Sequence, residues 1–452
     1  MTKLKDTISR AVDVDIMQLD IVNHADVTVD LKELYLDIKI YENIFSNTMS
    51  GSISFYDRNN MVKNLPLIGK ERIRIKFKTP STKSILEKEF RVYKISLKER
   101  VPGKDDTIVV LDFVSAPFFL NASTRISKSY QKKRFSEIAQ EVFQNYLQNK
   151  ITNNSSVGKK PENYTLNVVP STEEKTTVVV PNWNVFQTMN WLCKKAEHMG
   201  NCDYVFFERW GEFYFGPLSK LKEQNFDFNT SLFFYTPNEI NLGFSKMIHL
   251  EINKIMNYQE LTLGESKFEM EKSGAFSSTM ITNDITYKNI SYNKHSYVLD
   301  LIDESVSKLN KNPTNPITYL SSANPETKTM YRTKNSYAFD GVLEQYNPNN
   351  EQKRISQMMS NNSKIIHITV AGDTRRQLGS TAYVIIPSAE FLSANRTLNT
   401  KQDFDSTISG KYLISKIGHH IMKYDGYTMG IELMKDSSYL PTPDEVLVKN
   451  ME

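Results

Sequence analysis

The sequence is poor in the features that mark secreted, membrane-spanning or disulfide-bonded proteins. Only two of its 452 residues are cysteine, Cys193 and Cys202. No disulfide framework is therefore expected, and a reducing cytosol is the expected place of folding. No stretch approaches the ~18 apolar residues needed to span a bilayer. The charged start of the chain has no apolar run behind it, so we expect no secretory signal and no direct membrane insertion.

The chain also lacks a strong excess of charge. Its 56 Lys and Arg residues stand against 52 Asp and Glu, a net charge of +4. A protein that coats nucleic acid or binds a membrane surface usually carries a larger basic excess. The composition therefore argues against a dedicated DNA-binding role.

Catalytic motifs are missing as well. The sequence has no Gly-x-Ser-x-Gly nucleophile elbow, no phosphate-binding glycine-rich loop with Lys-Ser/Thr, and no His-Glu-x-x-His. We therefore expect no enzymatic activity, no catalytic residue, no metal and no cofactor. A cell-wall hydrolase stays open as an alternative, because the pairing of carboxylates cannot be read from sequence spacing.

Two clusters of potential metal ligands are predicted to have structural roles. Cys193, His198 and Cys202 lack the second Cys or His pair that a zinc site needs. We expect Cys193 on the buried stripe of a helix and Cys202 in a turn. His419 and His420 are neighbours on a predicted strand and point to opposite faces. A hydrogen-bonded strand histidine is the expectation there.

Aromatic residues are plentiful, with 23 Tyr and 24 Phe, and this favours strands. From about residue 27 the hydrophobic pattern has a period of two, as in Leu34–Tyr41 and again in Ile73–Phe77. A turn is predicted at Pro102–Asp105 between two further strands. We therefore predict an N-terminal extension over residues 1–26 and a first tube-like β domain over 27–118.

The next region, residues 119–240, is predicted to be a mixed α+β domain. Apolar residues from Phe135 to Leu147 recur with helical spacing. A second helix is predicted from about Asn184 to Met199, ended by Gly200. A hairpin is predicted around Arg209–Gly211.

Strands resume after about residue 241. A second tube-like β domain is predicted over 241–300 and 361–437, interrupted by an Asn/Pro-rich insertion over 301–360 and followed by a C-terminal tail over 438–452. The predicted fold is mainly β with α+β insertions: two similar tube-like antiparallel β-barrel domains, a mixed α/β domain and a surface insertion.

The two β domains share an order of features. Gly69, the strand Ile73–Phe77, Pro80 and a long hairpin correspond to Gly379, the strand Tyr383–Ile386, Pro387 and a second hairpin. This layout indicates duplication of one β module. Because soluble homo-oligomers usually close with cyclic symmetry, a trimer of such a chain would present six similar modules in a ring.

Basic residues gather at two places. Arg125, Lys128, Lys132, Lys133 and Arg134 precede the first helix, and we interpret them as a solvated helix entrance. Four like charges also share one strand face, and they repel one another unless something meets them. This face is either a polar exterior or a subunit interface that meets acidic groups of a neighbour, and we favour the interface; its residues are Arg72, Arg74, Lys76 and Lys78.

Several strings follow one another in a fixed order. They are Glu42–Phe45; Leu65–Glu71 leading into Phe77–Pro80; Val180–Asn184, followed by Tyr204–Phe207 and Gly211–Phe215; Gly372–Thr374 with Gly379; and Ser409–Ile414 with His419 or His420, Tyr427 and Ile431–Leu433. Their order over residues 28–436 resembles the baseplate central hub (tail hub) proteins of contractile-tailed bacteriophages.

The resemblance implies a structural homotrimer whose two tube-like domains per subunit form a pseudo-six-fold ring. Such a ring would join the tail tube protein to a central spike protein, meet baseplate wedge proteins, and let DNA pass only in transit during injection. It would lie in the virion tail baseplate after assembly in the host bacterial cytoplasm. The hub of a bacterial contractile injection or type VI secretion spike is an alternative, as is a carbohydrate-binding adhesin.

Overall fold

The computed structural model describes residues 10–23, 26–57, 71–80, 82–100, 106–148, 164–235, 251–261, 271–296, 308–310, 312–313, 328–334, 349–387, 405 and 407–438. Several predicted features lie outside these residues: Leu65–Lys70 with Gly69, the turn at Pro102–Asp105, and most of the Asn/Pro-rich stretch and the C-terminal tail. Among the described residues, no helix is long and apolar enough to cross a membrane.

The first β domain is a strongly curved antiparallel sheet with the strand order β2-β1-β5-β6-β7-β4-β3. Its buried residues alternate along the strands: Ile73, Ile75 and Phe77 of β5 point inward and are almost completely buried. The seven strands are β1 (Asp15–Val22), β2 (Thr28–Asp30), β3 (Tyr35–Asn43), β4 (Ser50–Asp57), β5 (Arg72–Lys78), β6 (Ile85–Arg100) and β7 (Thr107–Ser115).

The second β domain is a closed barrel, in which each strand pairs with two others and the last returns to the first. The order is β21-β20-β13-β14-β19-β22, with β22 pairing again with β21. Its strands are β13 (Leu232–Tyr235), β14 (Lys254–Leu261), β19 (Lys364–Ala371), β20 (Thr381–Ile385), β21 (Gly410–Met422) and β22 (Gly426–Lys435).

The two β domains repeat one topology. In the first, β3, β4, β7, β6 and β5 are consecutive neighbours and all antiparallel. In the second, β14, β19, β22, β21 and β20 show the same spatial order, the same chain order and the same antiparallel directions. The sixth strand differs. β1 runs antiparallel to β5, whereas β13 runs parallel to β20 and also pairs with β14, which closes the second ring. The prediction of a mainly β fold with two similar β domains is confirmed, and the second of these domains closes into a barrel by its own strand pairing.

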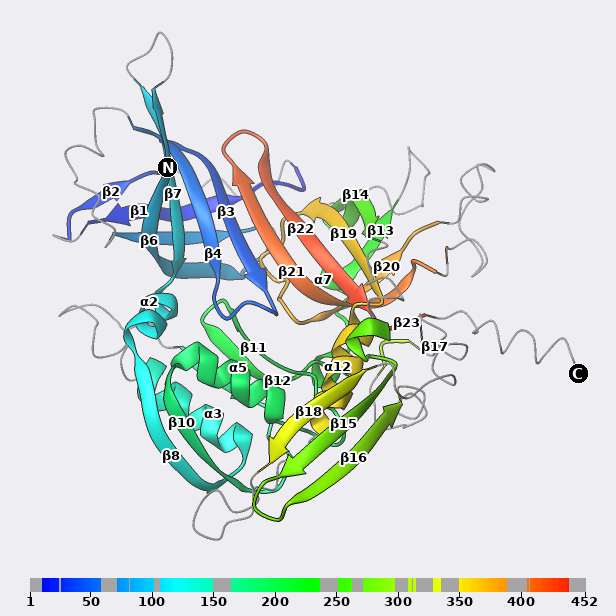
Figure 1. Ribbon diagram of the computed structural model, residues 1–452. Helices are drawn as coiled ribbons and strands as arrows, with labels where there is room; N and C mark the ends of the chain where they lie inside the picture. The colour runs from blue at the N-terminus through cyan, green and yellow to red at the C-terminus, as the bar shows by residue number, and fades with distance from the viewer. Residues whose placement is uncertain are drawn as a thin grey trace, which may run out of the picture.

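The long strand β21 joins the two domains into one 13-stranded sheet (Figure 1). Its first part, Gly410–Leu413, pairs with β20, and Lys416–Met422 pairs with β3. The chain just before β1 meets the β21–β22 turn, where the Tyr427 amide donates to the Val12 carbonyl at 2.7 Å. The hairpin of the second domain therefore completes the ring of the first.

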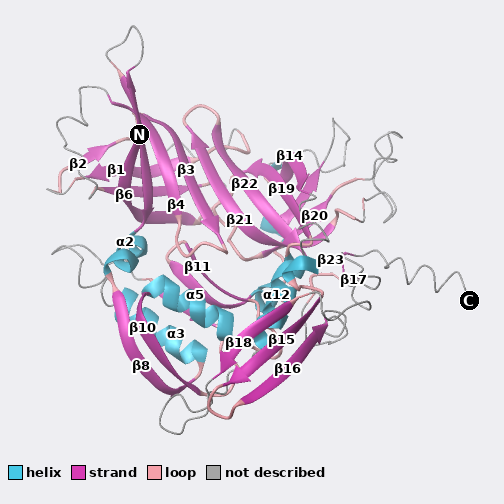
Figure 2. Cartoon of the chain, viewed as in Figure 1, coloured by secondary structure: helices cyan, strands magenta, loops and turns pink. Residues whose placement is uncertain are grey.

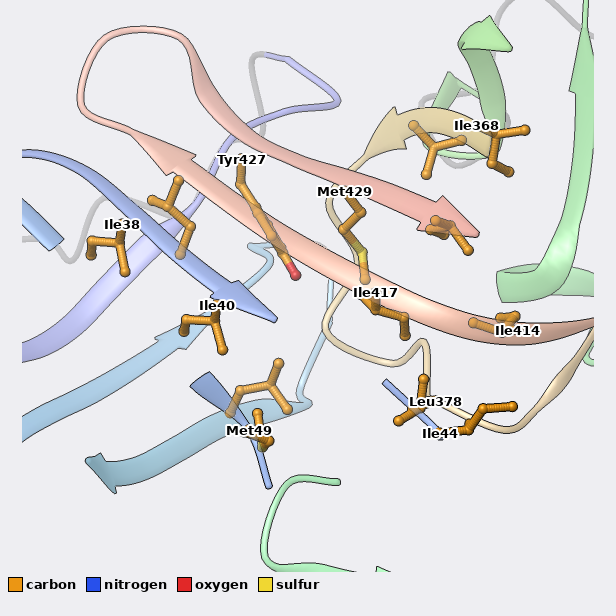
Figure 3. Close-up of a cluster of buried hydrophobic side chains, with 14 of the residues drawn as sticks. Ile38, Ile40, Ile44, Met49, Ile368, Leu378, Ile414, Ile417, Tyr427 and Met429 are labelled. Carbon is orange, nitrogen blue, oxygen red and sulfur yellow. The ribbon is translucent and has the colours of Figure 1, made fainter. Parts of the chain in front are cut away.

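One apolar core runs through both β domains. Figure 3 shows its part at the junction, to which Ile38 and Ile40 of β3, Ile417 of β21 and Met429 of β22 contribute side chains. Because the core is shared, the two β domains form one continuous layer, and neither has a separate core of its own.

Most of the helices lie below this layer, several of them in the mixed domain (Figure 2). The strands β8 and β10 form a two-stranded antiparallel sheet, β9, β11 and β12 form a small three-stranded sheet, and α3 and α5 lie against them. The elements are α2 (Ala116–Ser123), β8 (Arg125–Lys133), α3 (Phe135–Phe143), the π-helix η2 (Gln144–Gln148), β9 (Thr165–Val168), β10 (Thr176–Asn184), α5 (Val185–Lys195), β11 (Tyr204–Arg209), β12 (Glu212–Pro217), α6 (Leu218–Lys222) and α7 (Phe228–Ser231).

Helix α5 begins where the sequence predicts and ends earlier. The Asn184 side chain accepts from the Gln187 amide at 2.8 Å, and the Gln187 side chain accepts from the Asn184 amide, which is a capping box. The predicted end at Met199 is wrong, because Ala196 already adopts an extended conformation. Gly200, with φ of 81°, instead serves the turn before β11.

Three predicted domain borders differ from the strand pairing. Strand β1 lies within residues 1–26, yet it pairs with β5. Strand β13 lies within residues 119–240, yet it belongs to the second barrel. Strands β15 (Ser277–Asp284) and β16 (Asn289–Ser296) were assigned to the second barrel, yet they pair with β18 (Thr329–Lys334) in a separate sheet. A hydrophobic pattern with a period of two predicts that a strand exists, but it does not predict which sheet the strand joins.

This separate sheet is attached through a helix that the sequence did not predict, α12 (Asn349–Asn361). Gln352 of α12 donates to the Ser278 carbonyl of β15 at 3.0 Å, and Glu351 pairs with Lys195 of α5 at 2.7 Å. Arg354 donates to three backbone carbonyls of the mixed domain, those of Cys193, Cys202 and Tyr204. The short strands β17 (Asn312–Pro313) and β23 (Ser437–Ser438) pair nearby.

Candidate functional site

The basic face of β5 carries the residues that the sequence singled out as a subunit interface. Arg72, Arg74, Lys76 and Lys78 alternate along the strand with the apolar residues Ile73, Ile75 and Phe77. Of the four cations, Arg72 is itself buried, and the other three are partly exposed. Each of the four forms an ion pair within the chain, and the partners come from both sides: Arg74 with Glu89 (3.1 Å), Lys76 with Glu87 (2.5 Å), Lys78 with Asp15 (3.5 Å), and Arg72 with Asp26 and Glu89 (3.8 Å to the latter).

These pairs follow from the strand register. Glu89 and Glu87 of β6 lie directly opposite Arg74 and Lys76, and β1 places Asp15 opposite Lys78. The repulsion among the four cations, which led to the interface prediction, is therefore relieved inside the subunit. Acidic and basic side chains therefore lie side by side on this face, which is not a basic patch.

The junction of the β domains holds a buried polar network. His419 Nε2 lies 2.8 Å from Glu42 Oε1 of β3, and His419 Nδ1 lies 2.6 Å from the Tyr427 hydroxyl of β22. Trp210 of the mixed domain donates to the same Glu42 oxygen at 2.8 Å. Glu42 and His419 are almost completely buried, so the network links three parts of the chain where water is excluded. The prediction of a hydrogen-bonded strand histidine is confirmed.

Tyr427 is locked in place by a glycine. A Cβ atom added to Gly372 would lie 2.0 Å from the Tyr427 ring, so only glycine leaves room for it. Burial raises the pKa of Tyr427 well above its usual value, and its hydroxyl therefore stays protonated as a hydrogen-bonding group. Gly372 is the first residue of the sequence string Gly372–Thr374, and its role in this structure is to leave room for the Tyr427 ring.

A second buried network ties the first β domain to the mixed domain. Glu208 of β11 is fully buried and receives the Lys88 ammonium at 2.7 Å. Ser115 donates to it at 2.6 Å and the Met49 amide at 3.0 Å. These three partners belong to the first β domain, so the carboxylate ties the mixed domain to it.

Inside the second barrel, Arg376 is fully buried without a carboxylate partner at its guanidinium. It donates to the carbonyls of Thr230 (2.9 Å), Ala371 (2.5 Å) and Ile252 (2.8 Å) and to the Asn253 side chain. Burial lowers the pKa of Arg376 to about 10. The guanidinium therefore cross-links three backbone segments, and nothing in the sequence pattern predicts it.

The potential metal ligands do not converge. Cys193 lies on the buried side of α5, as predicted, and burial raises the pKa of its thiol to about 12. Cys202 is also buried, and His198 Nδ1 lies 2.7 Å from the Pro170 carbonyl oxygen. Among the described residues, no group of three or more His, Cys, Asp or Glu side chains could hold a metal ion.

The basic run before α3 forms β8 and the start of that helix. Lys128 and Lys133 both pair with Glu141 of α3, the first at 2.6 Å. These pairs lower the pKa of Glu141. The run thus supports the helix that follows it, in keeping with the predicted solvated helix entrance.

Comparisons with known proteins show which solved structures share this fold. No family model and no curated protein matches the sequence. Among solved structures, the tail protein from Neisseria meningitidis MC58 is similar, with a TM-score of 0.53 and 10% identity over 94% of this chain and 97% of that one. The 43 kDa tail protein of prophage MuSo2 from Shewanella oneidensis has a TM-score of 0.51 and 8% identity, over 93% and 99%. The chain has the fold of these tail proteins along nearly its whole length.

Proposed function

We propose that this chain, whose fold is that of solved tail proteins, is a non-enzymatic structural subunit of a baseplate hub in a phage contractile tail. Three copies would form a ring that joins the tail tube protein to a central spike protein and meets baseplate wedge proteins. DNA would pass through the ring during injection. The chain would be assembled in the host bacterial cytoplasm and then lie in the virion tail.

The observation that carries this proposal is the repeated strand topology. The five strands β3-β4-β7-β6-β5 and the five strands β14-β19-β22-β21-β20 share order and direction. They are fused side by side through β21 and share one core. A three-fold assembly of such subunits offers six similar domains at nearly equal spacing. A trimer could thereby meet a six-fold partner without a separate adaptor.

The mixed domain and the α12 module have no repeat among the described elements. In a trimer these parts would be related by three-fold symmetry alone, whereas the layer of β domains would have pseudo-six-fold symmetry. The proposed hub therefore presents different symmetries on its two sides, which is what a joint between a six-fold tube and a three-fold spike requires. The hub of a bacterial injection or secretion spike would use the same geometry, and the two settings differ in the attached spike rather than in this fold.

Native mass spectrometry tests the subunit count. We expect a trimer of the full chain, either alone or after addition of its spike partner, because the proposed ring contains three copies. A species that stays strictly monomeric under both conditions contradicts the proposal.

For the β5 face we propose a contribution to subunit association, and the ion pairs within the chain change how this is tested. Replacing all four cations with Glu would also destroy the pairs inside the subunit. The exchange Lys76→Glu with Glu87→Lys instead keeps a pair within the chain and reverses the charges offered to a neighbour.

We expect this double exchange to leave the stability of the subunit nearly unchanged and to weaken trimer formation by up to about fivefold, since exposed pairs contribute ~0–1 kcal/mol each. The effect should shrink in high salt, where screening is stronger. Sedimentation at two ionic strengths measures it. If the double variant assembles like the wild type at both ionic strengths, the β5 face does not belong to the subunit interface.

A further inference from the structure

Strand β6 is longer than its neighbour β5, and its second half has an open edge. β5 pairs with β6 only as far as Arg91, and from Lys94 onward no described strand pairs with that edge. The apolar side chains of Ile95 and Leu97 are exposed in this half. A long open edge that carries apolar side chains is a template for pairing with another strand.

The repeated topology identifies the equivalent of β6 in the second domain. In the five-strand order that the two domains share, β6 corresponds to β21 and β3 corresponds to β14. The amides of Val92 and Ile414 bond to the carbonyl of the residue just before β5 and just before β20, respectively. The next residue forms a bulge in each strand, Tyr93 in β6 and Ser415 in β21. The two long strands therefore align residue by residue at this point.

The half of β21 that follows the bulge is covered inside the chain. Residues Lys416–Met422 pair with β3, which lies beside β21 in Figure 1, and Ile417 is only 1% exposed. Ile95 stands at the equivalent position of β6, two residues after the bulge, yet it is 41% exposed. The strand that covers Ile417 thus has no described equivalent beside Ile95.

The strand that matches β3 in the second domain is β14, and it also has an open edge. The pairing of β3 with β4 has a bulge at Leu36, and that of β14 with β19 has one at Met256, so the two strands align. β13 pairs only with Lys254 and Ile255 of β14, and no described strand pairs with the same edge from Met256 to Leu261. This open edge corresponds to the edge of β3 that binds β21.

Figure 1 shows β6 and β14 on opposite sides of the β layer, so the two open edges do not meet within one subunit. We propose that the second half of β6 pairs in antiparallel fashion with β14 of a neighbouring copy, as β21 pairs with β3 inside the chain. The inference rests on the proposed ring and specifies the contact between its subunits. Such a head-to-tail contact generates a ring when its rotation closes, and every junction of the ring then has the same strand pairing.

The pairing inside the chain predicts the register of this contact. β21 places Gly418 opposite Tyr41 of β3. Through their partners on β7 and β22, Leu97 corresponds to Gly418. Through their partners on β4 and β19, Tyr41 corresponds to Leu261. Leu97 of one subunit therefore lies opposite Leu261 of the next, and two apolar side chains meet across the junction.

The next pair in this register joins opposite charges. Lys98 lies opposite Glu260 of the neighbouring subunit, where His419 lies opposite Ile40 inside the chain. The Glu260 side chain is 30% exposed and pairs with Lys364 at 2.7 Å through one oxygen. Its second oxygen can accept a further cation. Opposite charges stabilise a directly facing cross-strand pair, whereas like charges destabilise it, so the charges agree with this register.

Disulfide formation between subunits tests the pairing. In Leu97→Cys/Leu261→Cys, oxidation should link neighbouring subunits, because directly opposite Cβ atoms of antiparallel strands lie about 4.5–5.5 Å apart. The two native cysteines are buried and should not compete. Under the conditions in which native mass spectrometry detects the trimer, a non-reducing gel should show covalent dimers and trimers of the full chain.

Two further cysteine pairs are the controls. Tyr41→Cys/Gly418→Cys creates the equivalent pair inside one chain, so its oxidation should leave the covalent species at the mass of a single chain. Leu97→Cys/Asn257→Cys is displaced by four residues from the proposed register and should form no link between subunits. Circular dichroism checks that each variant folds.

A single charge reversal tests the register without a new cysteine. Lys98→Glu places like charges opposite one another and should weaken trimer formation about two- to fivefold. The loss should be smaller at high salt, because screening is stronger there. A Lys98→Glu protein that assembles like the wild type at low salt contradicts the facing of Lys98 and Glu260.

The outcomes separate this inference from the proposed function. A trimer in which Leu97→Cys/Leu261→Cys forms no covalent link between subunits overturns the strand pairing and leaves the proposed ring standing. Equal linking in Leu97→Cys/Asn257→Cys overturns the register. A chain that stays strictly monomeric, alone and with its spike partner, contradicts the proposed function and the strand pairing together.

Discussion

Glu208→Ala should lower the free energy of unfolding by about 3–5 kcal/mol, because it leaves the Lys88 ammonium buried without its counter-charge. Lys88 and Glu208 have side-chain exposures of only 3% and 0%. The Ser115 hydroxyl and the Met49 amide lose their acceptor at the same time. Denaturant unfolding followed by tryptophan fluorescence measures the change.

A neighbouring ion pair provides the matched control. Glu212 pairs with Arg209 at 2.8 Å, but the two side chains are 17% and 34% exposed. Glu212→Ala should therefore cost less than about 1 kcal/mol. The combination Lys88→Met with Glu208→Leu should recover much of the lost stability, since an apolar pair needs no counter-charge. Equal losses for Glu208→Ala and Glu212→Ala would show that the buried pair does not fix the mixed domain.

Gly51→Ala should destabilise the first β domain by about 3 kcal/mol, the upper range for overpacking a core. A Cβ atom at Gly51 would lie 2.2 Å from the Lys39 carbonyl oxygen and 2.6 Å from the Phe113 ring. Lys39 belongs to β3, which is paired with β4 on one side and β21 on the other. Its carbonyl cannot retreat without breaking the sheet at the junction of the two β domains.

Gly430→Ala is the control that tests whether replacing any strand glycine by alanine would destabilise the protein. Gly430 lies on β22, and a Cβ atom there would meet nothing within 4 Å. Gly430→Ala should be neutral or slightly stabilising, because alanine restricts the unfolded chain more than glycine does. Thermal unfolding of both variants makes the comparison, and a Gly51→Ala protein as stable as Gly430→Ala would contradict the packing of this junction.

Much of the fold could be predicted from local patterns. Alternation with a period of two located β3, β5, β19 and β22, and helical spacing located α3. The shared order of a strand, a proline and a long hairpin was enough to predict the duplicated module. These signals are local, because burying one face of a strand or helix leaves its period in the sequence.

Features that depend on distant pairing could not be predicted. Glu42 and His419 are 377 residues apart, and no pattern indicates that β3 and β21 are neighbours. The acidic partners of the β5 cations follow from register, which the sequence leaves open. Helix α12 escaped prediction because its buried positions include Gln352, Ser356 and Gln357, so it has no apolar stripe.

The central claim is that duplication within the chain turns a trimer into a ring with six similar β domains. Electron cryo-microscopy of the assembled protein, viewed along its axis, tests it most directly. The account predicts near-six-fold density in the layer formed by the two β domains and three-fold density in the layer of the mixed domain. A closed ring whose β layer shows only three domains, or any assembly with a subunit number other than three, would contradict it.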